Sequence, residues 1–394
     1  MFLGEVLNHV YVPELNEFCR KYFVKGEVEP TRQDVLLFQS RYDSLKANIF
    51  EAMMLYESVS FKVYGENVPL SILLNEMTIK GVEDLIEQGA LKFVHWTPMI
   101  VHMVDQIDGV NPIASGRLSS DVHTDPEASI KRTFDFMKNK PNKKQRDMLV
   151  RKVRDLYIEP EKGLEHDASN VVMSAYNSGK LKCLGLDNRV LDIYKLNAQQ
   201  KKLLTNSASE LLEHKFLVSQ NLMPHKTKTL NSLFSDSISK ISRTDAAIEI
   251  SKLENFPDLH NLSLELGNPL QNLPKYRSQK NTRKFRSWLN EISDSQELAE
   301  VTAAYINSID NAKGFFETKK GRLTKNVTMT GIGAGIGSFL GPAGTALGGL
   351  AGQALVPAAD FALDLVDEYF VTELLKGWKP RMFIDDMRKL QEQT

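Results

Sequence analysis

The chain has 394 residues, with 49 Lys and Arg against 50 Asp and Glu, and 42% of it is hydrophobic. These proportions are those of a globular protein of two or three domains, and they exclude collagen-like, mucin-like and wholly disordered chains. A net charge of −1 excludes a uniformly basic nucleic-acid binder, and two cysteines, Cys19 and Cys183, are too few for a disulfide framework or a four-thiolate metal site.

The start of the chain, MFLGEVLNHVYVPEL, does not have the composition of a secretory signal. It lacks a basic n-region, carries Glu5 within its short apolar run and has no small-residue cleavage site. Through residue 320, no run reaches the roughly 18 uncharged apolar residues that span a bilayer. Together with the low cysteine content, which fits a reducing compartment, these features predict a cytoplasmic protein.

The first clear element is a long helix predicted over 31–58. Thr31 can cap it, and Asp34 suits the positive end of the helix dipole. Its apolar residues are spaced three and four apart and form one narrow seam: Val35, Phe38, Tyr42, Leu45, Ile49, Ala52, Tyr56 and Val59. The seam predicts packing against another helix of the chain, and the alternative is a protein partner or second copy bound through 31–59.

Mixed helix and strand patterns follow. Alternating apolar residues over 59–63 predict a short strand, residues 79–88 predict a helix, and the run LKFVHW (91–96) predicts a second strand. Turn-forming residues are frequent over 108–126. We therefore expect a small α+β domain over 1–125.

The middle of the chain is predicted to be a helical domain over 126–310. Asp125 followed by Pro126 supplies an N-cap and the first-turn proline that helices favour. No self-similar period of 20 to 50 residues is visible, which argues against a repeat protein. The predicted helices cover 126–139, 143–157, 167–177, 196–220, 245–254, 283–292 and 296–309.

Two basic stretches lie in this domain. Between Lys131 and Arg154 there is a net charge of +8, and Lys275 to Arg286 has six basic residues with two aromatics and no acid. Such stretches bind nucleic-acid phosphates or anionic lipid, and a solvated helix face is the alternative. The candidate anion-binding residues are Lys131, Lys138, Lys143, Lys144, Arg151, Arg154, Lys275, Arg283, Lys284 and Arg286.

The most informative segment is 326–359, which has no charged side chain. Its glycines recur at four-residue steps, which places them on one helical face and lets another backbone approach closely: Gly333, Gly337, Gly341, and then Gly344, Gly348 and Gly352. In water each glycine costs a helix about 1 kcal/mol relative to alanine, whereas a bilayer forces the backbone to hydrogen-bond internally. The segment resembles the glycine zippers of membrane-inserting and pore-forming proteins.

This segment has two membrane geometries and two alternatives. A continuous helix kinked at Pro342 is long enough to span, and a turn at 341–344 gives a shallow helical hairpin. A soluble helical hairpin, whose helices pack closely through the same glycines, explains the sequence pattern equally well. A phosphate-binding loop fails in detail, because GIGAGIG has no GxGxxG in register and no following GK[ST].

Catalytic motifs are scarce. The eight histidines form no HExxH, and there is no CxxC or GxSxG, so no metal or cofactor is expected. The remaining candidates are His123 with Asp125, and the adjacent pair His166 and Asp167. That pair resembles the metal-binding pair of the all-helical HD phosphohydrolases, although the rest of their pattern is absent, and Asp167 as a helix cap is the alternative.

The predicted fold class is therefore mainly α. A small α+β domain is followed by the helical domain, a glycine-zipper helical hairpin over 326–359, and a C-terminal amphipathic helix and tail over 360–394. The predicted function is non-enzymatic. The zipper would be masked against the helical domain and released by a trigger on the N-terminal part, to engage lipid or form a homo-oligomer at the inner membrane.

This arrangement resembles bacterial membrane-attacking effectors, including those of anti-phage defence. Two alternatives remain open. One is a soluble helical adaptor or nucleic-acid-binding protein that uses the basic helices. The other is a metal-dependent hydrolase centred on His166 and Asp167.

Overall fold

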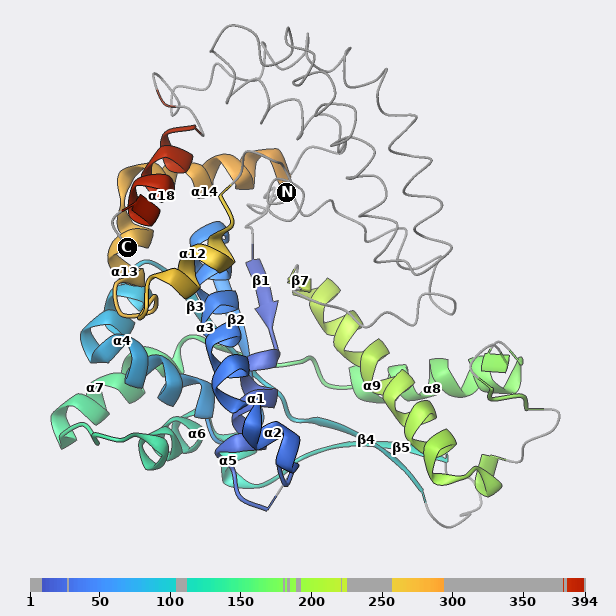
Figure 1. Cartoon of the computed structure of the whole chain (residues 1–394). Helices are drawn as coiled ribbons and strands as arrows, with labels where there is room; N and C mark the ends of the chain where they lie inside the picture. Colours follow the sequence, from blue (N-terminus) through green and yellow to red (C-terminus); the bar gives the residue numbers. More distant parts are fainter. Residues whose placement is uncertain are drawn as a thin grey trace, which may run out of the picture.

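The structure is a computed structural model, and its helices surround a five-stranded sheet (Figure 1). The described residues are 9–26, 28–103, 112–179, 181–182, 185–188, 193–220, 222–224, 257–293, 378 and 381–392. A mainly helical chain with a small sheet region near the N-terminus was predicted, and the described residues confirm it. The glycine segment and the predicted helices over 245–254 and 296–309 lie outside the described residues.

All strands of the main sheet run parallel, in the order β6-β3-β2-β1-β7. They are β1 (His9–Val12), β2 (Ser58–Val63), β3 (Leu91–His95), β6 (Tyr157–Ile158) and β7 (Met223–Pro224). The chain thus steps from β1 outward to β6 and then returns to the other side of β1. Because β6 and β7 come after residue 125, the sheet contains chain from both sides of the predicted division at that point.

Helices carry the crossovers that parallel strands require. The N-terminal helices are α1 (Glu14–Tyr22), α2 (Arg32–Leu36), α3 (Phe38–Leu55), α4 (Val68–Glu87), α5 (Asp121–Thr124), α6 (Pro126–Thr133) and α7 (Lys143–Arg154). The later helices are α8 (Leu164–Asn177), α9 (Ala198–Ser219), α12 (Leu259–Glu265), α13 (Leu273–Ser278), α14 (Lys280–Ser293) and α18 (Arg381–Glu392). Strands β4 (Pro98–His102) and β5 (Ile113–Arg117) form a separate antiparallel pair.

The helix predicted over 31–58 is not continuous, and this corrects the sequence analysis. It is divided into α2 and α3 at Leu37, whose backbone (φ −93°, ψ 4°) leaves the helical region. The later seam residues pack into the core as predicted, but Val35 at its start is 62% exposed. The break lets α2 turn away from the axis of α3, so the seam begins only at Phe38.

The two faces of the sheet differ in chemistry. One face is apolar and packs under α1, α3 and α4, through Val10, Val12, Val59, Phe61, Val63, Leu91 and Phe93. The other face alternates with it and carries mostly polar side chains, namely His9, Tyr11, Ser58, Ser60, Lys62, Lys92 and Val94. Buried parallel strands are usually apolar on both sides, so the polar groups need partners.

Helix α9 supplies one such partner. The Glu213 carboxylate accepts from the Tyr11 hydroxyl at 2.7 Å and from Lys62 Nζ at 2.9 Å. Lys62 Nζ also lies 4.4 Å from the centroid of the Trp96 ring. A single carboxylate therefore ties α9 to the centre of the sheet and neutralises Lys62.

The C-terminal helices belong to the same core as the N-terminal ones. Arg277 of α13 is 1% exposed, and its guanidinium donates to the carbonyl oxygens of Met53, Tyr56 and Glu57 at the end of α3. The distance to the Tyr56 oxygen is 2.8 Å. The last carbonyls of a helix have no intrahelical donor, so Arg277 satisfies that of Met53 together with two carbonyls directly after the helix. Its positive charge also suits the negative end of the helix dipole.

We predict that His9 makes stability depend on pH. Burial, aided by the charge of Lys92, lowers the pKa of His9 from 6.5 to about 4, so the folded chain keeps a neutral imidazole where the unfolded chain binds a proton. Stability is complete above about pH 6.5 and falls by about 3 kcal/mol towards pH 4, below which both states are protonated. Urea denaturation at stepped pH measures this fall.

The matched variants are His9→Asn and His166→Asn, since His166 is exposed. The first should reduce the fall between pH 6.5 and 4 by about 3 kcal/mol, the share of His9, and the second should leave the fall unchanged. Parallel curves for the native chain and His9→Asn would contradict the assignment.

Candidate functional site

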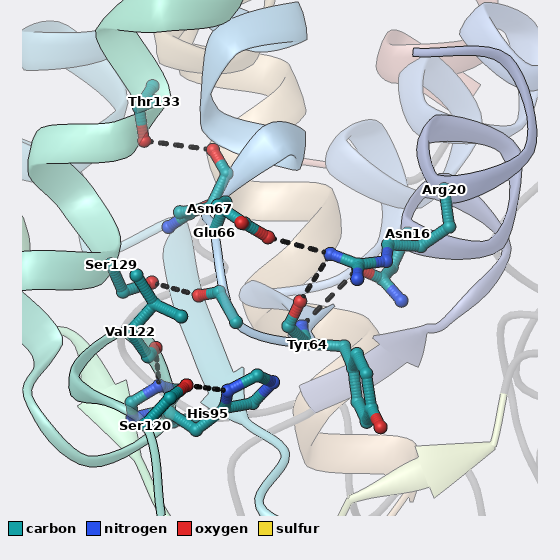
Figure 2. Close-up of polar contacts among 12 residues, drawn as sticks. Asn16, Arg20, Tyr64, Glu66, Asn67, His95, Ser120, Val122, Ser129 and Thr133 are labelled. Atoms are coloured by element: carbon teal, nitrogen blue, oxygen red, sulfur yellow. Dashed lines mark hydrogen bonds and ion pairs between the residues drawn. The ribbon is translucent and has the colours of Figure 1, made fainter. Parts of the chain in front are cut away.

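Polar side chains gather where the parallel strands end. Ligands of open α/β sheets bind outside the carboxyl ends of the strands, at the point where successive connections leave in opposite directions. Here that point is β1, because β2 and β7 flank it. Arg20 of α1, Tyr64 and Glu66 after β2, His95 at the end of β3 and His123 of α5 form the candidate site, most of which Figure 2 shows.

Arg20 organises the loop after β2. Its Nη1 donates to the Tyr64 carbonyl at 2.7 Å and to Glu66 Oε2 at 2.9 Å, and its guanidinium lies 5.1 Å from the Tyr64 ring centroid. One turn earlier in α1, Asn16 Oδ1 accepts from the Tyr64 backbone N–H at 3.4 Å. Figure 2 shows both α1 side chains directed at this loop. The buried Arg20 thus holds Glu66 beside the sheet edge.

His123 packs directly over Gly65. Its Nδ1 lies 2.7 Å from Ser120 Oγ, and its ring meets the Tyr64 ring edge-on at 5.1 Å. Its Nε2 is buried and has no hydrogen-bond partner among the described residues. Burial lowers the pKa of His123; Glu66 opposes this, and the charges of His95 and Arg20 add to it. Burial therefore favours the neutral imidazole, and its free nitrogen lies against Gly65 rather than towards solvent.

His95 is fully buried below the site. Its Nε2 lies 2.9 Å from the Val122 carbonyl oxygen, which only accepts, so Nε2 carries a proton. Its Nδ1 faces Glu159 Oε1 at 3.6 Å. The Tyr157 ring meets the imidazole edge-on at 5.3 Å. His95 therefore links the end of β3 to α5 through the Val122 carbonyl.

An inner layer of hydrogen bonds fixes the backbone of the loop over 64–67. Ser129 Oγ of α6 donates to the Gly65 carbonyl at 2.5 Å, and Thr133 Oγ1 donates to the Asn67 carbonyl at 2.9 Å (Figure 2). Asn67 Nδ2 donates to the Tyr157 hydroxyl at 2.9 Å, and burial raises the pKa of Tyr157. These contacts are internal and leave the half-buried Glu66 carboxylate and the exposed part of the His123 ring to meet a ligand.

The histidines and acids singled out in the sequence are only partly brought together. His166 and Asp167 are exposed on α8, where Asp167 pairs with Lys215 of α9. The helix begins at Leu164, so Asp167 is not its cap. Asp125 caps α6 as predicted, accepting from the Glu127 N–H at 2.9 Å. Within the described ranges, no three His, Cys, Asp or Glu side chains form a group suited to a metal ion.

The first basic stretch is partly neutralised. Glu127 pairs with Lys131 at 3.3 Å and with Arg154 at 3.0 Å, and Arg154 also pairs with Asp155. These pairs raise the pKa of Arg154. In contrast, five exposed cations of this stretch have no acidic partner in the part of the chain that the structure describes: Lys138, Lys143, Lys144, Arg146 and Arg151.

The second basic stretch is divided between core and surface. Arg286 is buried, and its Nη2 donates to the Arg277 carbonyl at 3.0 Å, so this guanidinium is not available to an external phosphate. Burial lowers the pKa of Arg286 to about 10. Lys275 and Arg283 are exposed, and Lys284 is half-buried.

Most of this site was not predicted from the sequence. His123 was a candidate, but Arg20, Glu66 and His95 belong to no recognised motif. Their positions could have indicated the site, because Glu66 comes directly after one predicted strand and His95 lies at the end of the next. Ligands of open α/β sheets bind at such strand ends.

Comparisons with known proteins found no relative. No protein-family model matches the chain, and no curated protein or solved structure is significantly similar to it. None of the described helices is both long and apolar enough to cross a bilayer.

We predict that Gly65→Ala disturbs the site. Gly65 has φ +73°, and a Cβ there would lie 3.0 Å from His123 Nε2. The variant should lose about 2 kcal/mol of stability and shift the NMR signals of the His123 ring. An alanine at positive φ is strained, and its Cβ must also displace that ring.

The matched control is Gly89→Ala. Gly89 has φ +66° with nothing within 4 Å of an added Cβ, so Gly89→Ala should be destabilised only by the backbone strain, about 1 kcal/mol. Equal losses in urea denaturation and an unmoved His123 signal would show that His123 does not pack on Gly65.

Proposed function

We propose that this chain is a non-enzymatic protein that acts at a membrane through residues 326–359, under the control of its α/β part. The observation that carries the proposal is the run of 34 uncharged residues in which six glycines recur at four-residue steps. Such glycine faces favour close helix contact in a bilayer, where the backbone must hydrogen-bond internally. Lipid or a second copy of the chain is the partner of this segment.

The α/β part supplies the trigger in this proposal. A polar ligand at the carboxyl edge of the sheet meets Glu66, His123 and the Tyr64 ring, all on connections after strands. A ligand acts as a trigger only if it binds one state of the protein better than the other. Contact with the loop over 64–67 would bias the packing of α1 and α6, because both helices bond to that loop.

We predict that the intact chain pellets with membranes after an alkaline carbonate wash and that a chain lacking 326–359 stays soluble. A third variant, with Gly337→Leu and Gly348→Leu, keeps the segment apolar but removes the flat glycine faces. It should still pellet, while leakage from vesicles or oligomer formation is lost. Solubility of both the intact and the shortened chain, or pelleting of both, would refute a membrane role for this segment.

A second candidate function is nucleic-acid binding through α7. The observation in its favour is the group of exposed cations at and before this helix that have no acidic partner among the described residues. Lys143→Glu with Lys144→Glu should weaken binding to DNA or RNA and reduce the salt slope by about one unit per lost phosphate contact.

Its control is Lys131→Glu, since Lys131 is already paired with Glu127. Filter binding across a salt series measures the slope. Binding without a salt slope, or an equal effect of all three substitutions, would exclude α7 as the contact.

A further inference from the structure

The polar face of the sheet contains a group of donors that nothing described so far uses. His9, Ser58, Ser60 and Lys92 lie on this face on three adjacent strands, with His9 in register with Ser58 and Ser60 in register with Lys92. The charge of Lys92 lowers the pKa of His9, which places the two groups in one electrostatic neighbourhood. The set is distinct from the candidate site at the carboxyl edge.

These groups differ from their neighbour Lys62 in having no acid. Lys62 on the same face is paired with Glu213 at 2.9 Å. Lys92 is half-buried, and no ion pair or hydrogen bond to its ammonium is found among the described residues. Burial lowers the pKa of Lys92, as expected for a cation without a compensating carboxylate.

A hydroxyl beside Lys92 is also unsatisfied. Ser60 is 0% exposed, and its Oγ has no hydrogen-bond partner among the described residues. On the next strand, His9 Nδ1 lies 2.5 Å from Ser58 Oγ, and this imidazole is neutral at pH 7 because its pKa is about 4. Leaving a buried donor without an acceptor is unfavourable, and a partly buried ammonium adds to that penalty.

All these groups can donate, and none of them carries negative charge. A compact oxyanion, with several acceptor oxygens, satisfies an ammonium and a hydroxyl together. We propose that Lys92 and Ser60, supported by His9 and Ser58, bind a compact oxyanion, a phosphate group or a carboxylate, on the polar face of the sheet. This site does not depend on the membrane function proposed above.

The test uses the full chain and thermal unfolding in matched ionic strength, with inorganic phosphate, acetate or chloride. Phosphate or acetate should raise the melting temperature of the native chain above its value in chloride, because an anion that binds only the folded state stabilises it. Stabilisation by phosphate alone identifies a phosphoryl ligand, and stabilisation by acetate as well identifies a carboxylate-type site. Ser60→Ala should weaken the apparent anion affinity by about tenfold.

The decisive variants are Lys92→Met and Lys62→Met. Without added anion, Lys92→Met should melt at or above the native temperature, since it removes an uncompensated cation, and anions should no longer stabilise it. Lys62→Met should melt lower, because it leaves Glu213 without its cation, yet keep the anion effect. Lys92→Arg retains the charge and should retain anion binding.

Three results would overturn the proposal. The first is that neither anion stabilises the native chain. The second is that an anion stabilises the native chain and Lys92→Met equally, which places its binding elsewhere. The third is that Lys92→Met melts as low as Lys62→Met, which shows that Lys92 already has an acidic partner within the folded chain.

Discussion

The parallel pairing of β1, β2 and β3 is the constraint on which the rest of this structure depends. Parallel neighbours need crossover connections, so helices must cover the faces of the sheet. Right-handed crossovers in one direction place α1, α3 and α4 on one face, and the return from β6 to β7 brings α8 and α9 to the other. The same pairing directs every carboxyl end to one edge, where the connections can offer polar side chains to a ligand.

The two faces meet different demands because their side chains differ. The apolar face is satisfied by packing alone, whereas the polar face depends on individual hydrogen-bond partners, such as Glu213 for Tyr11 and Lys62. At the carboxyl edge, Arg20 and Ser129 fix the backbone of one loop from two helices. That loop is therefore positioned by side chains that are distant from it in the sequence. A glycine is needed at position 65 because His123 packs directly on its backbone.

Local patterns predicted the parts of the fold that local energetics determine. The strand over 59–63 alternates and ends near Gly65, the strand over 91–96 is an apolar run that follows Gly89, and the cap at Asp125 follows from its side chain alone. The break at Leu37 was not predictable, because no glycine or proline marks it; the capping box of Thr31 and Asp34 only fixes where α2 begins. Strand β1 has four residues and is stabilised mainly by pairing with chain about fifty residues away. The candidate site was predictable only in part for the same reason. His166 and Asp167 are adjacent in the sequence but form no site, whereas the Tyr64 ring and Gly65, on which His123 packs, come from another segment of the chain.

Helix α3 also bears on how this protein is made. The donor for its final carbonyls is Arg277, which lies 221 residues beyond Tyr56. A ribosome that adds about 5 to 20 residues per second needs on the order of ten seconds or more to reach it. During that interval the N-terminal strands and helices exist without the group that completes α3. The early half of the chain therefore finishes folding only after its late half has been synthesised, and fragments that stop before α13 carry an uncapped helix end in their core.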